Sequence, residues 1–472
     1  MKIKKAVLIE PKFPWFNLFS YARIPLLGLP ILGSILKKMG IDVIIFCENI
    51  ASIDWNMVKK TDIVGITALT SLVPRAYKLI NKIKKVNSRC KIIMGGVHVT
   101  FRPEEALEHG ADFVVRNEGE KTLKELIECL ENNSNPKKIK GLSFKKNGKY
   151  YHNPDRNEPQ NLNNIPAPDF SLIKKFRKLN YIPIQTSRGC PHNCEFCSVV
   201  QMFGRKIRYR KSTRVIKDLK TINNTFDLNK KHVFFVDDNF SADENRTLDL
   251  LKNLKNLNID LDWSTQEEVN VYKKKKVLDL MKKTGCSRLY LGIESFDQKV
   301  LNEYNKPQKA ENIKHAIKTI HDRDILIHGM FVLGADTTTE KTIINTSRAA
   351  VDYKLDTAQF FVLVPLPGTR LFKMLKKEGR ILLDSVKDWE LFDGHHVVFK
   401  PKNLSPYRLQ QLQIQAFKKF YNLKNSLNWL IRKKYKNFTS TIYGTWAIRK
   451  WIYRKKGYLK QLKSNYHSTI PK

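Results

Sequence analysis

The sequence predicts an α/β protein with two parallel sheets followed by a basic, mainly helical C-terminal region. In residues 1–140, short runs rich in Val and Ile alternate with helix-length segments, and the same alternation returns in residues 176–395. The composition then changes in residues 396–472, where no acidic residue occurs. The length of 472 residues suits two or three domains.

The first unit contains five strand candidates, which are Lys5–Glu10, Asp42–Phe46, Asp62–Thr67, Lys91–Gly96 and Asp112–Arg116. Helical patterns such as residues 74–85 and 120–131 separate them. This alternation predicts a Rossmann-like, doubly wound sheet, which binds ligands at the carboxyl ends of its strands. The loops at those ends are residues 67–71, 95–103 and 116–120. Paired glycines there let the backbone approach a ligand, although ordinary turn chemistry would explain any one of these loops alone.

Residues 141–175 join the two units. Asn147 and Gly148 suit a type I′ turn, so residues 141–153 are predicted to form a hairpin. The proline-bearing stretch of residues 163–170 then serves as a linker, and we place the domain boundary there.

The second unit contains six strand candidates, which are Tyr181–Ser187, His232–Asp238, Leu261–Gln266, Arg288–Ser295, Leu326–Gly334 and Ala358–Pro365. A helical stretch follows each of them. Six such units predict a partial (β/α)6 barrel, a TIM-barrel-like sheet short of eight strands. The functional site of such a barrel lies at the carboxyl ends of its strands.

Three cysteines, Cys190, Cys194 and Cys197, follow the first strand of the second unit with the spacing C-x₃-C-x₂-C. Thiolates bind zinc or iron–sulfur clusters, and a structural zinc site needs a fourth ligand. His192 is too constrained to supply it, and Cys286 is better explained as a buried, inert cysteine. We therefore expect a 4Fe–4S cluster whose fourth iron stays open to a small molecule, as catalytic metal sites do.

The cysteine spacing, with the aromatic Phe196 before the third cysteine, resembles the radical S-adenosylmethionine (SAM) enzymes. The resemblance implies that SAM chelates the open iron and is cleaved to a 5′-deoxyadenosyl radical. That family commonly binds the methionyl amino group with a Gly-Gly-Glu pattern after the second strand. This chain has "VDDNF" there, so Asp237 or Asp238 could substitute, or could cap the next helix.

The same resemblance implies further SAM contacts at the other strand ends. Glu294 and Ser295 follow the fourth strand, where the family often contacts the ribose, and Gly334 lies where the adenine approaches. Gln266 ends the third strand and is a weaker candidate. Thr369 follows the sixth strand and could instead cap the next helix.

The sequence of the first unit indicates a narrower family. "RIPLLGLPILGSILKKMGIDVIIF", "DIVGIT" and "GGVHVTFRPEEALEHGADFVVRNEGE", together with "GCPHNCEFC", resemble the cobalamin-dependent radical SAM enzymes over roughly residues 1 to 400. The resemblance implies cobalamin contacts at Thr67, Thr70, Gly95, Gly96, His98, Glu118 and Gly119. The Asp-x-His-x-x-Gly motif of many cobalamin proteins has no counterpart, because residues 10–27 contain no histidine. We therefore expect cobalamin without a histidine axial ligand, and His98 as a loop residue packing on the corrin.

These resemblances favour methylation of an unactivated carbon of a small-molecule or lipid substrate, with a reductant such as flavodoxin or ferredoxin. A radical oxidation, rearrangement or cyclisation without net methylation stays open. A tRNA methylthiotransferase would carry three further cluster cysteines, whereas Cys47, Cys90 and Cys129 are scattered over separate elements. A zinc-stapled binding module would require both α/β patterns to be coincidental.

The C-terminal region is strongly basic. The whole chain has a net charge of +40, and residues 401–472 contain 17 Lys and Arg but no Asp or Glu. A helix is expected over residues 409–425, and Trp429, Trp446 and Trp451 lie among the cations. Such helices lie on anionic membranes, which we favour over nucleic acid, although a helical cap with solvated lysines explains the pattern equally well.

The sequence indicates a cytoplasmic location, with peripheral contact at the inner face of the membrane. The N-terminus "MKIKKAVLIE" lacks a signal peptide, and no apolar run reaches the 18 residues of a membrane span. The scattered cysteines suit a reducing compartment better than a disulfide framework.

Overall fold

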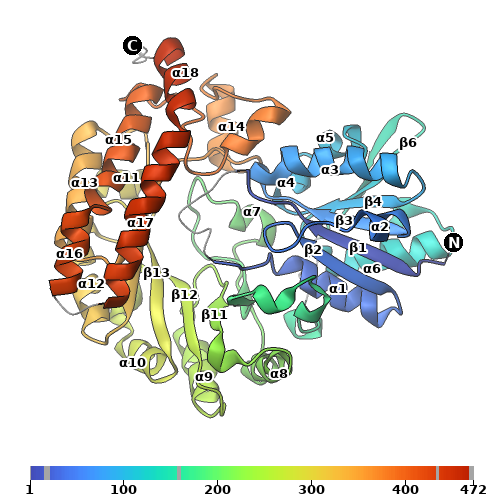
Figure 1. The fold of residues 1–472 in the computed structure, drawn as a ribbon, viewed down its shortest axis with the longest axis horizontal. Coiled ribbons are helices and arrows are strands. Elements are labelled where there is room, and N and C mark those ends of the chain that lie inside the picture. Colours follow the sequence, from blue (N-terminus) through green and yellow to red (C-terminus); the bar gives the residue numbers. More distant parts are fainter. Residues whose placement is uncertain (1, 15–21, 157–160, 432–434, 467–472) are drawn as a thin grey trace.

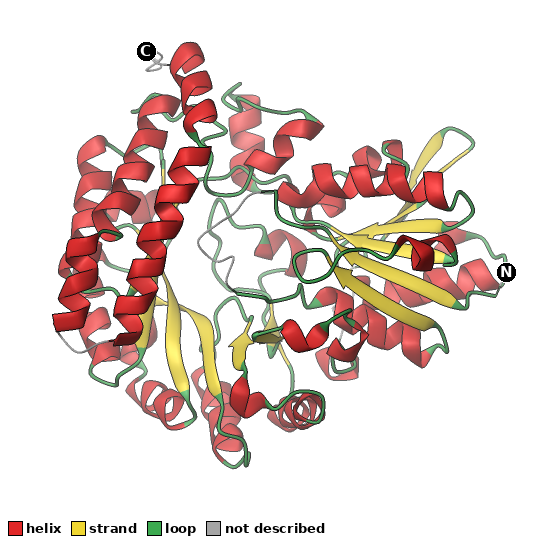
Figure 2. Ribbon diagram, in the orientation of Figure 1, coloured by secondary structure: helices red, strands yellow, loops and turns green. Residues whose placement is uncertain are grey.

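The computed structural model describes residues 2–14, 22–156, 161–431 and 435–466. Two sheets form the body of the molecule, and their strands end toward a shared central region (Figures 1 and 2). The first sheet, blue in Figure 1, lies on the right, and the second, green to yellow, lies on the left. The C-terminal helices, in red, pack beside the second sheet.

The first sheet has seven strands in the order β2-β1-β3-β4-β5-β6-β7. Its strands are β1 (Lys5–Glu10), β2 (Asp42–Cys47), β3 (Ile63–Thr67), β4 (Lys91–Gly95), β5 (Phe113–Val115), β6 (Leu142–Lys146) and β7 (Lys149–His152). The first five are parallel, which confirms the predicted Rossmann-like sheet. Nearly every residue of β1 is buried because both faces of a parallel sheet are covered.

Helices cover both faces of this sheet. They are α1 (Gly28–Lys38), α2 (Trp55–Lys59), α3 (Val73–Val86), α4 (Val97–Phe101), α5 (Pro103–Glu108) and α6 (Gly119–Glu131). Leu36 of α1 and Leu126 of α6 belong to one apolar core, whereas Ile80 of α3 belongs to the other. Each helix contributes one apolar stripe, as the 3.6-residue period requires.

The hairpin formed by β6 and β7 continues the first sheet. Strand β6 pairs antiparallel with β5, so this part of residues 141–175 is not a separate segment between the units. Asn147 and Gly148 both have positive φ angles, 50° and 76°, as a type I′ turn requires.

The second sheet has six parallel strands in the order β15-β14-β13-β12-β11-β8, which confirms the predicted partial barrel. They are β8 (Tyr181–Ile184), β11 (His232–Phe235), β12 (Asp262–Glu268), β13 (Cys286–Glu294), β14 (Leu326–Leu333) and β15 (Thr357–Val362). The first strand ends earlier than expected, because Ser187 joins a short antiparallel ladder between β9 (Ser187–Arg188) and β10 (Arg208–Tyr209).

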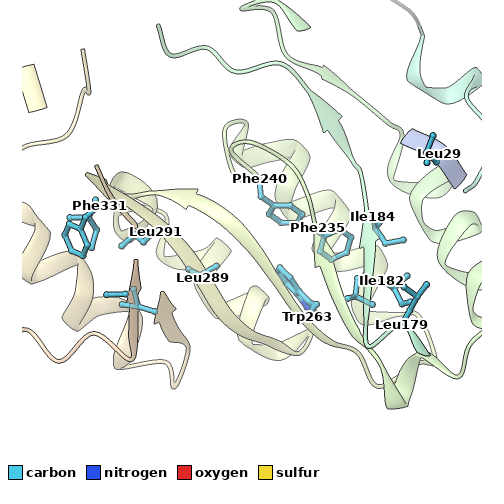
Figure 3. Packing of buried hydrophobic residues seen from close by; sticks show 14 of the residues in the cluster. Leu29, Leu179, Ile182, Ile184, Phe235, Phe240, Trp263, Leu289, Leu291 and Phe331 are labelled. Carbon is cyan, nitrogen blue, oxygen red and sulfur yellow. The ribbon is translucent and has the colours of Figure 1, made fainter. Parts of the chain in front are cut away.

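Helices alternate with these strands. They are α7 (Val199–Phe203), α8 (Ser212–Asn223), α9 (Glu244–Lys255), α10 (Lys275–Lys283), α11 (Gln298–Glu303), α12 (Ile313–His321), α13 (Glu340–Asp352) and α14 (Arg370–Lys377). Figure 3 shows how aromatic rings fill the core beside β11 and β12. The rings of Phe235 and Phe240 lie 5.2 and 5.5 Å from that of Trp263, whose indole N–H donates to the carbonyl of Thr284 at 2.7 Å. A buried tryptophan is stable there because its polar group has a partner.

The C-terminal region contains α15 (Pro406–Phe420), α16 (Leu423–Ile431), α17 (Tyr435–Arg454) and α18 (Lys456–Tyr466). The helix expected over residues 409–425 therefore ends at Phe420. The Tyr421 hydroxyl donates to the carbonyl of Ala358 in β15 at 2.8 Å, so the chain turns to bond the last barrel strand. Within the described ranges, no helix is long and apolar enough to cross a membrane.

Candidate functional site

The loop that carries the three cysteines is fixed by side chains from two later elements. The main-chain carbonyl of Asn193 accepts a hydrogen bond from Arg370 at 2.5 Å and another from Asn305 at 3.1 Å. The Arg370 guanidinium also pairs with Glu195 at 2.9 Å. The loop is therefore held in a defined conformation between the start of α14 and the loop after α11.

The three cysteine thiols are half-buried, and in the absence of a metal this burial opposes their ionisation. Burial raises the pKa of Cys190 to about 11 and that of Cys197 to about 12. They are protonated at neutral pH until a metal displaces the protons. The residues fit an iron–sulfur cluster with one open iron, because three free thiols on one short loop can hold three irons of a 4Fe–4S cluster and leave the fourth for another molecule.

Two residues that could complete a four-ligand zinc site with the cysteines are engaged elsewhere. His192 does not join the cysteines, because its Nε2 lies 3.0 Å from the carboxylate of Glu268. Cys286 does not join the three cysteines either, because it is buried in β13 and its thiol is directed to the carbonyl of Arg288.

Lys306 is a residue of this site that the sequence analysis missed. Its ammonium lies 2.8 Å from the carboxylate of Glu294, and both side chains are about nine-tenths buried. Burial opposes its charge, but Glu294 and the neighbouring Cys194 and Cys197 raise its pKa above the usual value. The site thus contains a permanent positive charge beside the cluster cysteines.

Asp237 and Asp238 are adjacent but differ in environment. The Asp237 carboxylate is fully buried and accepts hydrogen bonds from Thr186 N at 3.0 Å and from the Ser187 hydroxyl at 2.6 Å. It therefore shapes the turn that leads into the cysteine loop. Asp238 is half-buried, and burial followed by the charge of Asp237 raises its pKa to about 7. Of the two aspartates, Asp238 is the one whose carboxyl group is partly exposed near Cys190 and Cys197.

The other predicted SAM contacts are buried at the strand ends, except for the half-buried Gln266. Glu294 has a φ of 61°, a rare backbone conformation for a non-glycine residue, at the end of β13. Gly334 has a φ of 104°, and a Cβ there would lie 2.8 Å from the side chain of Leu409. Thr369 is buried and caps α14 by accepting from Phe372 N at 3.1 Å. Ser295 is buried and accepts from Asp297 N, while Gln266 is half-buried in β12.

A cavity of about 240 Å³ lies at the carboxyl ends of the first sheet. Five of the seven residues expected to contact cobalamin line it, namely Thr67, Gly95, Gly96, Glu118 and Gly119. A Cβ on Gly96 would lie 2.8 Å from the carbonyl of Ala68, so only glycine leaves this edge open. The apolar lining includes Leu8, Leu123 and Phe203, and the volume is large enough for only part of a large organic cofactor.

The structure places His98 and Thr70 elsewhere. His98 is fully buried in the second core, where its Nε2 lies 3.1 Å from Glu105 and its ring meets the edge of Trp389. It does not line the 240 Å³ cavity, contrary to the expectation of a loop residue packing on the corrin. Thr70 lines a different cavity, described below. Residues 15–21, part of the histidine-free stretch after β1, lie outside the described residues.

Buried ion pairs connect the two sheets beside the first cavity. Arg188, two residues before Cys190, pairs with Glu120 at 2.5 Å and with Glu118 at 3.5 Å. Arg208 also pairs with Glu118. Burial raises the pKa of Glu120, but Arg188 outweighs this effect and the net shift is downward. The loop that lines the first cavity is therefore fixed to the loop that carries the cysteines.

A second cavity of about 470 Å³ lies between the two sheets. The loop after β3 contributes Leu69 and Thr70, the cysteine loop contributes Phe196, and β15 contributes Phe361. The C-terminal helix α17 contributes Trp451. Residues from all three parts of the chain thus meet around one volume.

The comparisons with known proteins agree with this arrangement. The family model described as B12 binding domain matches residues 20–127, and the one described as Radical SAM superfamily matches residues 184–350. The chain is 33% identical over 408 residues to an uncharacterized methyltransferase of Pyrococcus horikoshii, covering 84% of this chain and 88% of that protein. It is 26% identical over 444 residues to the bacteriochlorophyllide d C-12(1)-methyltransferase of Chlorobaculum tepidum, covering 90% and 91%.

A solved structure shares the fold. The radical SAM methyltransferase TsrM from Kitasatospora setae, solved with cobalamin and a 4Fe–4S cluster bound, aligns with a TM-score of 0.66 at 16% identity over 80% of this chain and 78% of that one. The cofactors of the family are the 4Fe–4S cluster, SAM and cobalamin, and both matched regions carry the residues described above. By its two matched domains and its relatives, the chain belongs to the cobalamin-dependent radical SAM enzymes.

Proposed function

We propose that this enzyme transfers a methyl group to an unactivated carbon of a small molecule. The observation that carries the proposal is the 470 Å³ cavity, because the loop after β3 and the cysteine loop both line it. A substrate there would face both cofactor regions at once. The relatives named as methyltransferases support the same outcome.

The proposed roles of the residues follow from their surroundings. Cys190, Cys194 and Cys197 hold the cluster, and Asp238 binds the amino group of SAM. Lys306, held by Glu294, offers its charge to the SAM carboxylate or to the cluster itself. Thr67, Gly95, Gly96, Glu118 and Gly119 line the cavity that holds part of the cobalamin. Asp237, Arg188 and Arg370 position these groups without touching the reacting atoms.

When bound, the cluster supplies the electron that cleaves SAM, and cobalamin supplies the methyl group. The substrate carbon loses one hydrogen atom, which ends on 5′-deoxyadenosine, and gains one methyl group. The protein holds the substrate between its two sheets and excludes water with the apolar walls of Phe196 and Phe361. Each turnover would take two electrons from the reductant, one to cleave SAM at the cluster and one to return the cobalt to the state that accepts a methyl group from a second SAM, which would leave as S-adenosylhomocysteine.

Anaerobic incubation with a reductant, trideuteromethyl-SAM and a small-molecule extract of the source cells tests this proposal. We expect deoxyadenosine and S-adenosylhomocysteine together, with a product that is 17 mass units heavier than its precursor, since CD₃ replaces H. The Cys194→Ala variant should form neither compound. Deoxyadenosine without S-adenosylhomocysteine or a labelled product would instead indicate an oxidation, rearrangement or cyclisation.

We further propose that a small acidic electron carrier, such as a flavodoxin or ferredoxin, reduces the cluster. The net charge of +40 would attract such a partner over long range. Reduction by flavodoxin should therefore slow steeply between low and physiological salt, whereas reduction by dithionite should not.

We also propose that α16 contacts an anionic membrane surface. Leu423, Leu427 and Ile431 recur at helical spacing and are 53%, 51% and 78% exposed. No acidic residue occurs after residue 400 to oppose binding. Co-sedimentation with phosphatidylglycerol vesicles should fall for Leu427→Glu and less for Asn428→Glu, which adds the same charge beside the stripe. Equal pelleting of these two variants would contradict insertion of the leucines.

A further inference from the structure

The 470 Å³ cavity between the sheets has a composition that differs sharply from that of the chain. The sequence contains 85 Lys and Arg among 472 residues. Yet among the described residues that line the cavity there is no Lys or Arg. The walls are mainly apolar, with Phe361, Phe392 and Trp451 among them. The volume lies within the range of about 300–1,000 Å³ that small-molecule sites occupy.

Asp393 and His395 line the cavity from the segment that follows α14 and precedes α15, while Thr70, Ser71 and Ser198 line it from the loop after β3 and the cysteine loop. Asp393 accepts from His395 N at 2.8 Å and from the His396 ring at 2.9 Å. Burial raises the pKa of Asp393, but the neighbouring His396 outweighs this effect, so the carboxyl stays ionised. Burial lowers the pKa of His395 to about 4, so its ring is neutral at physiological pH.

His395 leaves one hydrogen-bonding atom unused. Its Nδ1 is buried and has no partner among the described atoms, while its ring meets the edge of Phe361 at 4.8 Å and lies 5.4 Å from Trp451. A buried polar atom without a partner is unfavourable, and a small rotation of the ring that turns Nδ1 toward the cavity would let a ligand supply the partner. Lys455 donates to the His395 carbonyl but does not itself line the cavity.

From this lining we infer that the substrate is a largely apolar molecule without a negative charge, which presents a hydroxyl, amide or amine to Asp393 and His395. An anionic group, such as a phosphate or phosphonate, would meet the Asp393 carboxylate and no lining cation, because the ammonium of Lys455 lies behind His395 and is bound to its carbonyl, so the anion would lose its hydration without replacement. The inference rests on the proposed function, since it assigns the cavity to the molecule that is methylated. It also gives the C-terminal region a place in the active site through Trp451.

Equilibrium dialysis of the enzyme loaded with cluster and cobalamin tests the inference, because it measures binding without turnover. The probes are Nile red, which is neutral and apolar, and 1-anilinonaphthalene-8-sulfonate, which is similar in character but anionic. We expect Nile red to bind at one site, and Trp451→Ala and Phe361→Ala each to weaken it about tenfold or more, as for loss of a core aromatic contact. Trp446→Ala, on the same helix but 51% exposed, serves as the matched control.

The Asp393→Asn variant tests the role of the negative charge. Asp393→Asn keeps the size of the side chain and an acceptor for His395 N but removes the negative charge. It should strengthen binding of the anionic probe several-fold and change Nile red little. A wild-type enzyme that binds both probes equally, or Nile red binding that Trp451→Ala and Phe361→Ala leave unchanged while the cobalamin spectrum is intact, would overturn the inference. Neither result depends on methyl transfer, so failure of the proposed function would be recognised separately by its product analysis.

Discussion

The ammonium of Lys306 lies 2.8 Å from the carboxylate of Glu294, and this buried pair is adjacent in space to the cluster cysteines. Neither residue is near the cysteines in sequence. The ends of β13 and of the loop after α11 bring them together, and the Gln308 side chain donates to the carbonyls of Gly292 and Ile293 to fix that geometry. The region of the three cysteines therefore includes a fixed cation that their own loop does not supply.

Replacement of Lys306 by Met should make the cluster harder to reduce. A nearby positive charge stabilises the reduced cluster, so its loss should lower the midpoint potential, on the order of tens of millivolts. A redox titration followed by electron paramagnetic resonance measures this shift. Lys309→Met, three residues away and exposed, is the control. Equal midpoint potentials for wild type and Lys306→Met would contradict an effect of this charge on the cluster.

Adjacent aspartates should give different defects. Asp237→Asn places an amide against the N–H groups of Thr186 and Ser187, so the cysteine loop should shift and bound iron should fall. Asp238→Asn should keep its iron but bind SAM about tenfold more weakly, because a charge-assisted hydrogen bond contributes about 1.5–3 kcal/mol. Iron analysis and equilibrium dialysis with SAM separate the two. Identical behaviour of the variants would contradict the division of roles.

Arg188 should couple cobalamin binding to the cysteine loop. Arg188→Met leaves Glu118 and Glu120 without this partner next to the first cavity, and breaking such a buried pair costs about 3–5 kcal/mol. Cobalamin affinity, measured by spectral titration, should fall at least about tenfold. The additional change Glu120→Gln should recover part of the loss. Lys206→Met, on the exposed part of the same segment, should have no effect, and a similar loss there would argue for a general charge effect.

Glu267 should make the protein less stable as the pH rises. Burial raises its pKa from 4.5 to about 8, so the folded state favours the protonated form. Its stabilising contribution is complete below pH 4.5, declines between pH 4.5 and 8, and is lost above that, a difference of about 3–5 kcal/mol. Glu267→Gln should therefore melt at a higher temperature than wild type at pH 9 but not at pH 5. The exposed Glu311→Gln should follow wild type, and a pH-independent effect of Glu267→Gln would exclude this origin.

The fold was predictable because the spacing of apolar residues along the chain distinguishes strands from helices. Val- and Ile-rich runs gave both parallel sheets, and Asn147-Gly148 gave the hairpin turn. The attachment of that hairpin to β5 was not predictable, since pairing between strands distant in sequence depends on the whole packing. For the same reason the C-terminal helices looked like a separate basic appendage, whereas Tyr421 and Trp451 pack them on the barrel and its cavity.

The site was predictable where the residues are close in sequence. The spacing of the three cysteines predicted a metal-binding loop, and the alternation of strands and helices predicted which loops lie at the strand ends. Lys306, Arg188 and His395 did not, because a single cation or histidine in one sequence carries no signal until its partners are known. The family resemblance led us to expect His98 at the corrin, whereas the folded chain buries it against Glu105 and Trp389.

The most direct test of the two-cofactor site is the metal content of one purified, anaerobically reconstituted sample. We predict about four iron atoms and one cobalt atom per chain, with iron lost in Cys190→Ala and retained in Cys286→Ala, and cobalt retained in both. One zinc per chain without iron or cobalt, or about eight iron atoms, would contradict the assignment of a single three-cysteine cluster facing a cobalamin domain.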